Sequence, residues 1–169
     1  MKKGTEILIF TEMKYSRLTK EQFEEMQQEF INFLASQSIT AEEWGEIKKN
    51  KPKVAEQELD VFSDLVWEGV LNKVEYLEHF SANQIYLFHL TEATIHLIAI
   101  KVEHQGVDLT TRKGYGWLQT NLLDESVNIY TSSKALSDDR NKDIFALIKQ
   151  GATITKGELY AFFDKMVEA

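Results

Sequence analysis

Two of the four histidines in this 169-residue chain flank a short polar segment, in the stretch FHLTEATIH that ends at His96. The flanking runs IYLFHL and TIHLIAIKV are rich in β-branched and aromatic residues, which favours two strands joined by a turn. If Glu92 and Ala93 form the centre of the turn, His89 pairs with His96. Paired residues of a sheet point to the same face, with Cβ atoms about 5 Å apart. The two imidazoles are therefore predicted to be neighbours.

Such a pair could supply two ligands to a divalent metal ion, or could act in acid/base catalysis. Zinc and iron sites need at least a third ligand, and the best candidates nearby are Glu75 and His79, which we expect one turn apart on a helix. No known metal-binding spacing covers Glu75, His79, His89 and His96. The simpler, structural interpretation is that His89 and His96 are half-exposed at the end of the hairpin. Glu75 and His79 would then lie on the solvent-facing edge of the helix. A register shift of one residue would place the two histidines on opposite faces.

Other polar clusters are better explained by structure than by chemistry. The stretch RKGYGW, from Arg112 to Trp117, lacks the glycine spacing of a phosphate-binding loop and is typical of a helix start. In SDDRNKD, the residues Asp138, Asp139 and Asp143 lack the glycine and distal glutamate of a calcium loop. Aspartates at a helix start already have a role in capping and in complementing the helix dipole.

A phrase that occurs four times predicts where helices begin. It consists of an apolar residue, Ser or Thr, two variable residues, Glu or Gln, and a second apolar residue: LTKEQF, ITAEEW, FSANQI and ITKGEL. The hydroxyl caps the first turn, the Glu or Gln reaches back to the cap, and the apolar pair packs together. Helices are predicted over residues 19–36, 40–51 and 53–78, and another from Thr155 to the end of the chain.

The remaining elements complete an α+β, helix-rich single domain over residues 13–169. We expect three N-terminal helices, a small sheet made of the hairpin and one further strand in VNIYT, and two C-terminal helices over residues 144–149 and from Thr155. Another helix is predicted between hairpin and strand, around residues 111–122. A competing interpretation continues a helix from FSANQI through His89, because short apolar runs do not separate helix from strand clearly.

Composition narrows the classes of function. The chain has a net charge of −8 and a pI near 5.1, which repels phosphate backbones, so no nucleic-acid partner is expected. It has no cysteine, which excludes disulfides and thiolate chemistry and fits a cytoplasmic protein. Its longest apolar runs are too short to span a membrane, and its start is unlike a secretory signal.

Four phrases, MKYSRLTKEQF, SQSITAEEW, DVFSDLVWEGVL and KVEYLEHFS, resemble an uncharacterised family of small acidic proteins of flavobacteria and their relatives. The similarity runs from Met13 to the C-terminus. The family carries no established activity, so the resemblance implies no catalytic residue. It does imply that residues 1–12 are an upstream extension outside the shared region.

The hypothesis favoured by the sequence is a non-catalytic protein-interaction or regulatory module, which binds another protein or itself through an aromatic helix surface or an uncovered strand edge. It requires no cofactor. The alternative is a metal-dependent or acid/base enzyme that uses His89 and His96.

Overall fold

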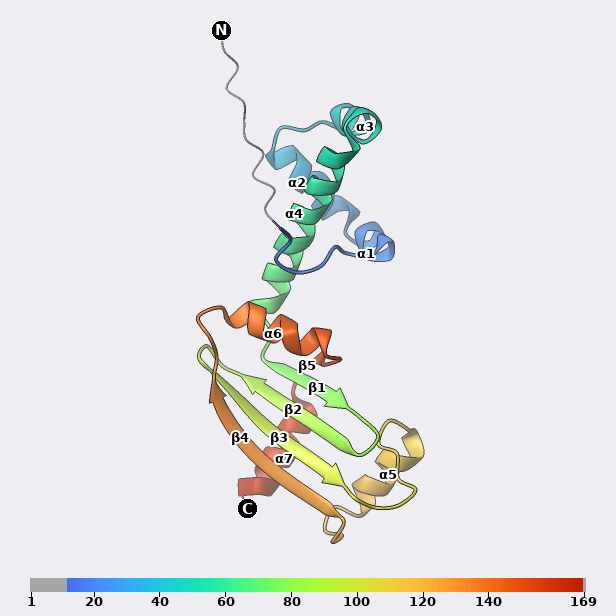
Figure 1. Ribbon diagram of the computed structural model, residues 1–169, viewed down its shortest axis with the longest axis vertical. Helices are drawn as coiled ribbons and strands as arrows, with labels where there is room; N and C mark the ends of the chain where they lie inside the picture. Colours follow the sequence, from blue (N-terminus) through green and yellow to red (C-terminus); the bar gives the residue numbers. More distant parts are fainter. Residues whose placement is uncertain (1–11, 169) are drawn as a thin grey trace. The chain divides into compact units, whose positions relative to one another are not determined.

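The computed structural model describes residues 12–168 of the chain (Figure 1). Contacts divide the chain into two compact units, residues 1–69 and 70–169, and each is described by itself. Because the contacts divide the chain into two units, the single domain expected over residues 13–169 stays a prediction. Among the described residues, no helix is both long and apolar enough to cross a membrane.

The helices are α1 (Lys20–Glu25), α2 (Gln27–Ser36), α3 (Ala41–Asn50), α4 (Pro52–Leu71), α5 (Arg112–Thr120), α6 (Arg140–Lys149) and α7 (Glu158–Glu168). The strands are β1 (Tyr76–Phe80), β2 (Gln84–Leu90), β3 (Thr94–Val102), β4 (Val127–Ala135) and β5 (Thr153–Thr155). The α+β class is thus confirmed.

Two of the four predicted helix starts have the expected capping box. Thr19 accepts a hydrogen bond from the backbone N–H of Gln22 and Thr40 accepts one from Glu43, and each partner's side chain bonds back to the cap residue. The expected first helix is interrupted at Met26, whose backbone angles of φ −109° and ψ 27° separate α1 from α2. Pro52 opens α4, where its missing N–H costs nothing.

Aromatic side chains and a short N-terminal strap hold the N-terminal unit together. Phe62 of α4 packs against the rings of Phe23, Phe30 and Phe33, at centroid distances of 5.9, 5.1 and 5.4 Å. The strap comprises residues 13–18 and runs beside α4. The backbone N–H groups of Lys14 and Tyr15 donate to the Asp64 carboxylate at 2.8 and 2.9 Å.

The C-terminal unit is built on one antiparallel sheet with strand order β4-β3-β2-β1-β5. The hairpin and its register are confirmed, because His89 pairs with His96 and Leu90 pairs with Ile95. Two strands were missed. β1 lies in the region predicted as the end of the third helix, and β5 lies where the last helix was expected to begin.

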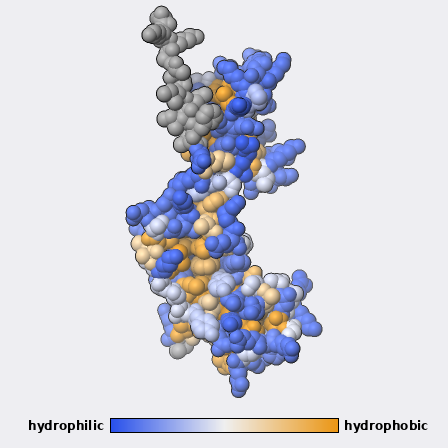
Figure 2. Space-filling model, in the orientation of Figure 1, coloured by the Kyte–Doolittle hydropathy of each residue, from blue (hydrophilic) through white to orange (hydrophobic). Residues whose placement is uncertain are grey.

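Different helices pack on the two faces of the sheet. On the first face, Ile85, Leu87, Ile98 and Ile100 form a core with residues of α5 and α7, among them Phe163. Figure 1 shows α7 behind the sheet and α6 across one end of it. The other face is only partly covered, and Figure 2 shows an apolar surface over α6 and the strands beside it.

Three further expectations are corrected. The third helix ends at Leu71 rather than near residue 78, because the chain from Tyr76 onward pairs with β2 and β5. The phrase FSANQI is a strand connection rather than a helix start, and the backbone N–H of Ser81 donates to the carbonyl of Gln84 at 2.8 Å. The last helix begins at Glu158, three residues later than predicted.

Candidate functional site

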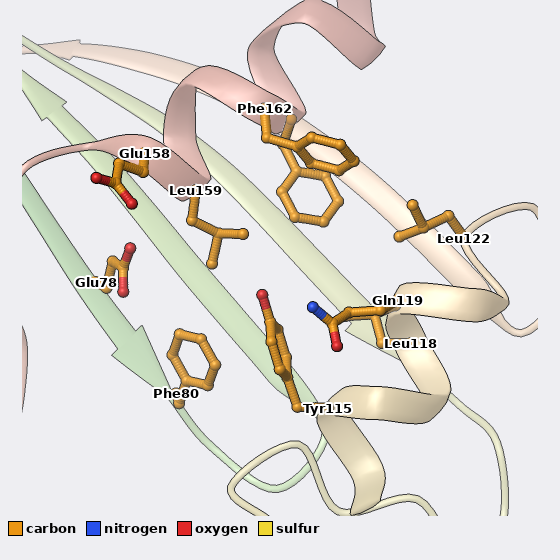
Figure 3. Close-up of a pocket in the computed structure, with 10 residues that line it drawn as sticks. Glu78, Phe80, Tyr115, Leu118, Gln119, Leu122, Glu158, Leu159 and Phe162 are labelled. Carbon is orange, nitrogen blue, oxygen red and sulfur yellow. The ribbon is translucent and has the colours of Figure 1, made fainter. Parts of the chain in front are cut away.

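A groove of about 580 Å³ lies between α5, α7 and the sheet of the C-terminal unit (Figure 3). Its walls are apolar apart from two carboxylates, a phenol and an amide. The lining residues are Glu78, Phe80, Tyr115, Leu118, Gln119, Leu122, Glu158, Leu159, Phe162 and Phe163. This size falls within the range of small-molecule sites, which are mostly apolar with a few convergent polar groups.

The periodicity of each element directs these side chains into the groove. On β1, Glu78 and Phe80 are two residues apart and so point to the same face of the sheet as Ile85 and Leu87. On α5, the lining residues are spaced by three and four, as expected for one helix face. On α7, Glu158 and Phe162 are four residues apart. One strand and two helices therefore meet at a single concave site.

Two polar groups of the groove, Glu78 and Tyr115, have raised pKa values. Burial raises the pKa of Glu78, and the nearby charge of Glu158 raises it further. Burial also raises the pKa of Tyr115, with an added contribution from the charge of Glu78. Figure 3 shows the Glu78 and Glu158 carboxylates facing each other, with the Tyr115 hydroxyl directed into the groove. Perturbed groups gathered in a cleft are a common mark of a functional site.

These groups are not paired with each other. Within residues 12–168, the side chains of Glu78, Glu158 and Tyr115 have no protein partner for a hydrogen bond or an ion pair. A carboxylate on the inner face of a sheet, among Phe80 and Leu159, costs free energy unless something binds it. The arrangement therefore presents acceptors toward the interior of the groove.

Replacing Glu78 with glutamine is expected to increase the free energy of unfolding at pH 7. Because the pKa of Glu78 is raised in the folded chain, folding favours the protonated carboxyl over the carboxylate. The free energy of unfolding therefore falls as pH rises and Glu78 ionises. The gain should be about 0.5 kcal/mol at pH 7, the scale for partly exposed charges. It should vanish at about pH 4, below the ordinary pKa of glutamate. Urea unfolding at both pH values measures it.

The exposed Glu75, which does not line the groove, provides the control. Glu75→Gln removes the same charge from the residue just before β1. Its effect on the free energy of unfolding at pH 7 should be smaller than that of Glu78→Gln. A Glu78→Gln protein that is less stable than wild type at pH 7 contradicts the assignment of Glu78 as an unfavourably placed carboxylate.

The histidine pair lies elsewhere on the same face of the sheet. The rings of His89 and His96 are 5.9 Å apart, so they are neighbours as predicted. His89 stacks on Tyr76 at 4.7 Å, and Nδ1 of His96 lies 2.8 Å from the Oγ of Ser133. Aromatic packing and a hydroxyl thus surround the pair.

The other two candidate ligands do not join the pair. The prediction that Glu75 and His79 share a helix face is wrong, since His79 is in β1 and Glu75 immediately precedes it. His79 pairs with Tyr86, on the sheet face opposite His89. Within residues 12–168, no group of three or more His, Asp or Glu side chains is placed to hold a metal ion.

Sequence reasoning missed the groove because Glu78 was assigned to a helix. The only signal was in YLEHF, where the period of a strand would place Tyr76, Glu78 and Phe80 on one face, but this stretch does not alternate apolar and polar residues. Helical spacing from Val70 through Val74 to Leu77 outweighed it.

The fold and the groove define an α+β protein with a small-molecule-sized cleft on a helix-covered antiparallel sheet. The chain belongs to the family described as Family of unknown function (DUF6495), whose model matches residues 13–168. This confirms the resemblance to an uncharacterised family, while the attribution to flavobacteria stays a prediction. No curated protein and no solved structure matches the chain.

Proposed function

We propose that the C-terminal unit is a non-catalytic module that binds a small organic molecule in the groove between α5, α7 and the sheet. The observation that carries the proposal is the set of unpaired polar groups, Glu78, Glu158 and Tyr115, that face an otherwise apolar cleft. Such a cleft supplies apolar area for affinity and a few polar groups for orientation.

The composition of the groove favours binding over catalysis. Its ten lining residues include no Ser, Thr, Lys or His, so nucleophile and base pairs built on those side chains are absent from the lining. The histidines considered for catalysis, His89 and His96, are not among the lining residues. Small-molecule binding differs from the protein-interaction or regulatory module expected from the sequence and shares only its non-catalytic character.

Two neighbouring leucines allow a matched test. Leu122 lines the groove, whereas Leu123 is 93% exposed and does not line it. A library of small aromatic and aliphatic compounds at about 1 mM, the range of weak fragment binding, would be screened by amide NMR. Compounds that shift resonances of α5, α7 and β1 in the wild type should lose their effect in Leu122→Trp, where the indole fills the groove.

The Leu123→Trp protein should bind as the wild type does. The proposal is overturned if no compound shifts groove resonances in the wild type, or if Leu122→Trp binds the same compounds equally well.

A second candidate function is self-association through β4, and the free edge of that strand favours it. Within the described residues, β4 pairs only with β3 along all nine of its residues, whereas the opposite edge strand β5 has three. Residues 130–135 are exposed. Long, regular edges without a proline or an inward charge are sites of strand pairing.

The sequence of β4 suits antiparallel pairing with a second copy. A twofold axis at Thr131 places Lys134 opposite Asn128 of the other copy, so the one charged residue of β4 does not meet its own equivalent. Sedimentation should show a dimer that weakens at least about tenfold in Thr131→Lys, which places two lysines together at the axis. Thr153→Lys, on the exposed β5, should leave it unchanged. A wild type that remains monomeric at about 1 mM excludes this function.

A further inference from the structure

The two carboxylates of the groove lie together without a cation. Glu78 projects from β1 and Glu158 from the first turn of α7, and their side chains face each other in Figure 3. The charge of Glu158 is close enough to perturb Glu78. Within residues 12–168, no Lys, Arg or His forms an ion pair with either carboxylate. This end of the groove therefore carries uncompensated negative charge.

The remainder of the groove is apolar and partly aromatic. The rings of Phe80 and Tyr115 lie 5.8 Å apart beside the carboxylates, and Leu159 and Phe162 form the wall contributed by α7. Phe162 is 51% exposed, so about half of its surface remains in contact with water. An apolar body in the groove would remove such surface from water, and the rings would also attract a cation.

This combination discriminates between ligand classes. An anion would be repelled by both carboxylates, and a neutral molecule would leave their charges uncompensated. A bare metal ion would find two carboxylates and no third His, Asp or Glu in the described residues. A cationic head on an apolar body satisfies both parts of the groove at once, because its charge offsets Glu78 and Glu158 while its body covers Leu159 and Phe162.

We infer that the ligand of this groove is an organic amine, whose ammonium group binds between Glu78 and Glu158 and whose apolar body lies along Phe80, Leu159 and Phe162. The Tyr115 hydroxyl, which points into the groove, accepts a further hydrogen bond from the ammonium group. The inference rests on the proposed function and specifies the chemistry of its ligand.

Three probes of similar shape test the inference: 2-phenylethylamine, 2-phenylethanol and 3-phenylpropionate. Dissociation constants at pH 7 would be measured by amide NMR titration of the full chain. The amine should bind at least about tenfold more tightly than the alcohol, and the carboxylate should bind most weakly. Glu78→Gln should weaken the amine about tenfold and leave the alcohol unchanged, while Glu75→Gln should change neither.

The outcomes separate the inference from the proposed function. If the alcohol or the carboxylate binds at the groove as tightly as the amine, the cation inference is overturned while small-molecule binding stands. If amine affinity is the same in wild type, Glu78→Gln and Glu158→Gln, the placement of the ammonium group is overturned. If none of the probes or library compounds shifts groove resonances, both are overturned.

Discussion

Replacing Gly114 with alanine should lower the free energy of unfolding of the C-terminal unit by about 3 kcal/mol, the upper range for overpacking a tight site. Gly114 is buried in the first turn of α5, and a Cβ there would lie 1.8 Å from the carbonyl oxygen of Asp108. The obstacle is backbone, which cannot rotate away as a side chain can. The same oxygen already accepts hydrogen bonds from the N–H and Oγ1 of Thr111.

The effect should extend to the groove. Relief of the clash requires α5 to move away from residues 108–111, and α5 carries Tyr115, Leu118 and Gln119. Gly114→Ala should therefore weaken the binding of the compounds whose effect is lost in Leu122→Trp. Urea unfolding and amide hydrogen exchange in β2 and β3 measure the stability of this unit.

Gly116 offers a control two residues along the same helix. Apart from the neighbouring residues and the backbone of α5 itself, no atom lies within 4 Å of a Cβ built at Gly116. Gly116→Ala should stabilise the protein by about 0.5 to 1 kcal/mol through helix propensity alone. If Gly114→Ala is as stable as Gly116→Ala, the close approach of α5 to Asp108 does not constrain the fold.

Local patterns predicted the hairpin correctly because all the relevant information lies within a few residues. The polar turn fixes which residues pair, and a register shift of one residue would expose the apolar face of β3. The same holds for the caps at Thr19 and Thr40, where side chain and backbone lie three residues apart.

β1 was missed because distant segments decide its conformation. The apolar residues Val70, Val74 and Leu77 also fit a helix, and only pairing with β2 and with residues 153–155 selects a strand. A single sequence does not reveal these partners. The groove was missed for the same reason, since Glu78 points toward α5 and α7 only if it belongs to a strand.

The phrases that carried the family resemblance have a structural explanation. MKYSRLTKEQF contains the strap, and DVFSDLVWEGVL contains the part of α4 that contacts it. The backbone N–H of Leu18 donates to the Oγ of Ser63 at 3.1 Å, and the Nε1–H of Trp67 donates to the carbonyl of Ser16 at 3.0 Å. These residues bind backbone groups of the chain itself. The contacts between the strap and α4 therefore explain two of the four phrases by a role in folding rather than by a catalytic role.

Arg140 connects α6 to two other segments of the C-terminal unit through their backbone carbonyls. Its guanidinium donates to the carbonyls of Leu71 at 3.1 Å and Val74 at 2.6 Å, at the end of α4 and just after it. It also donates to the Thr91 carbonyl at 2.8 Å, in the turn between β2 and β3. The planar fork of arginine suits several acceptors at once, and lysine has no equivalent geometry.

Arg140→Ala should therefore lower the free energy of unfolding by about 3 kcal/mol, since hydrogen bonds to charged groups contribute about 1.5 to 3 kcal/mol each and are partly replaced by water. Arg140→Lys should recover less than half of this loss, because one ammonium group cannot reach the carbonyls of Leu71, Val74 and Thr91 at once. Hydrogen exchange should increase most in the turn after Leu90, whose own carbonyl is a fourth, longer contact at 3.4 Å.

Exposed Arg112, in the first turn of α5, is the matched control. Arg112→Ala removes a cation from a helix N-terminus, where the helix dipole disfavours it, so stability should stay the same or rise slightly. If Arg140→Lys is as stable as wild type, charge alone would explain Arg140 and its fork geometry would be unimportant. Loss in both Arg140 variants, with none in Arg112→Ala, identifies the three-carbonyl contact as what fixes α6 to the hairpin end of the sheet.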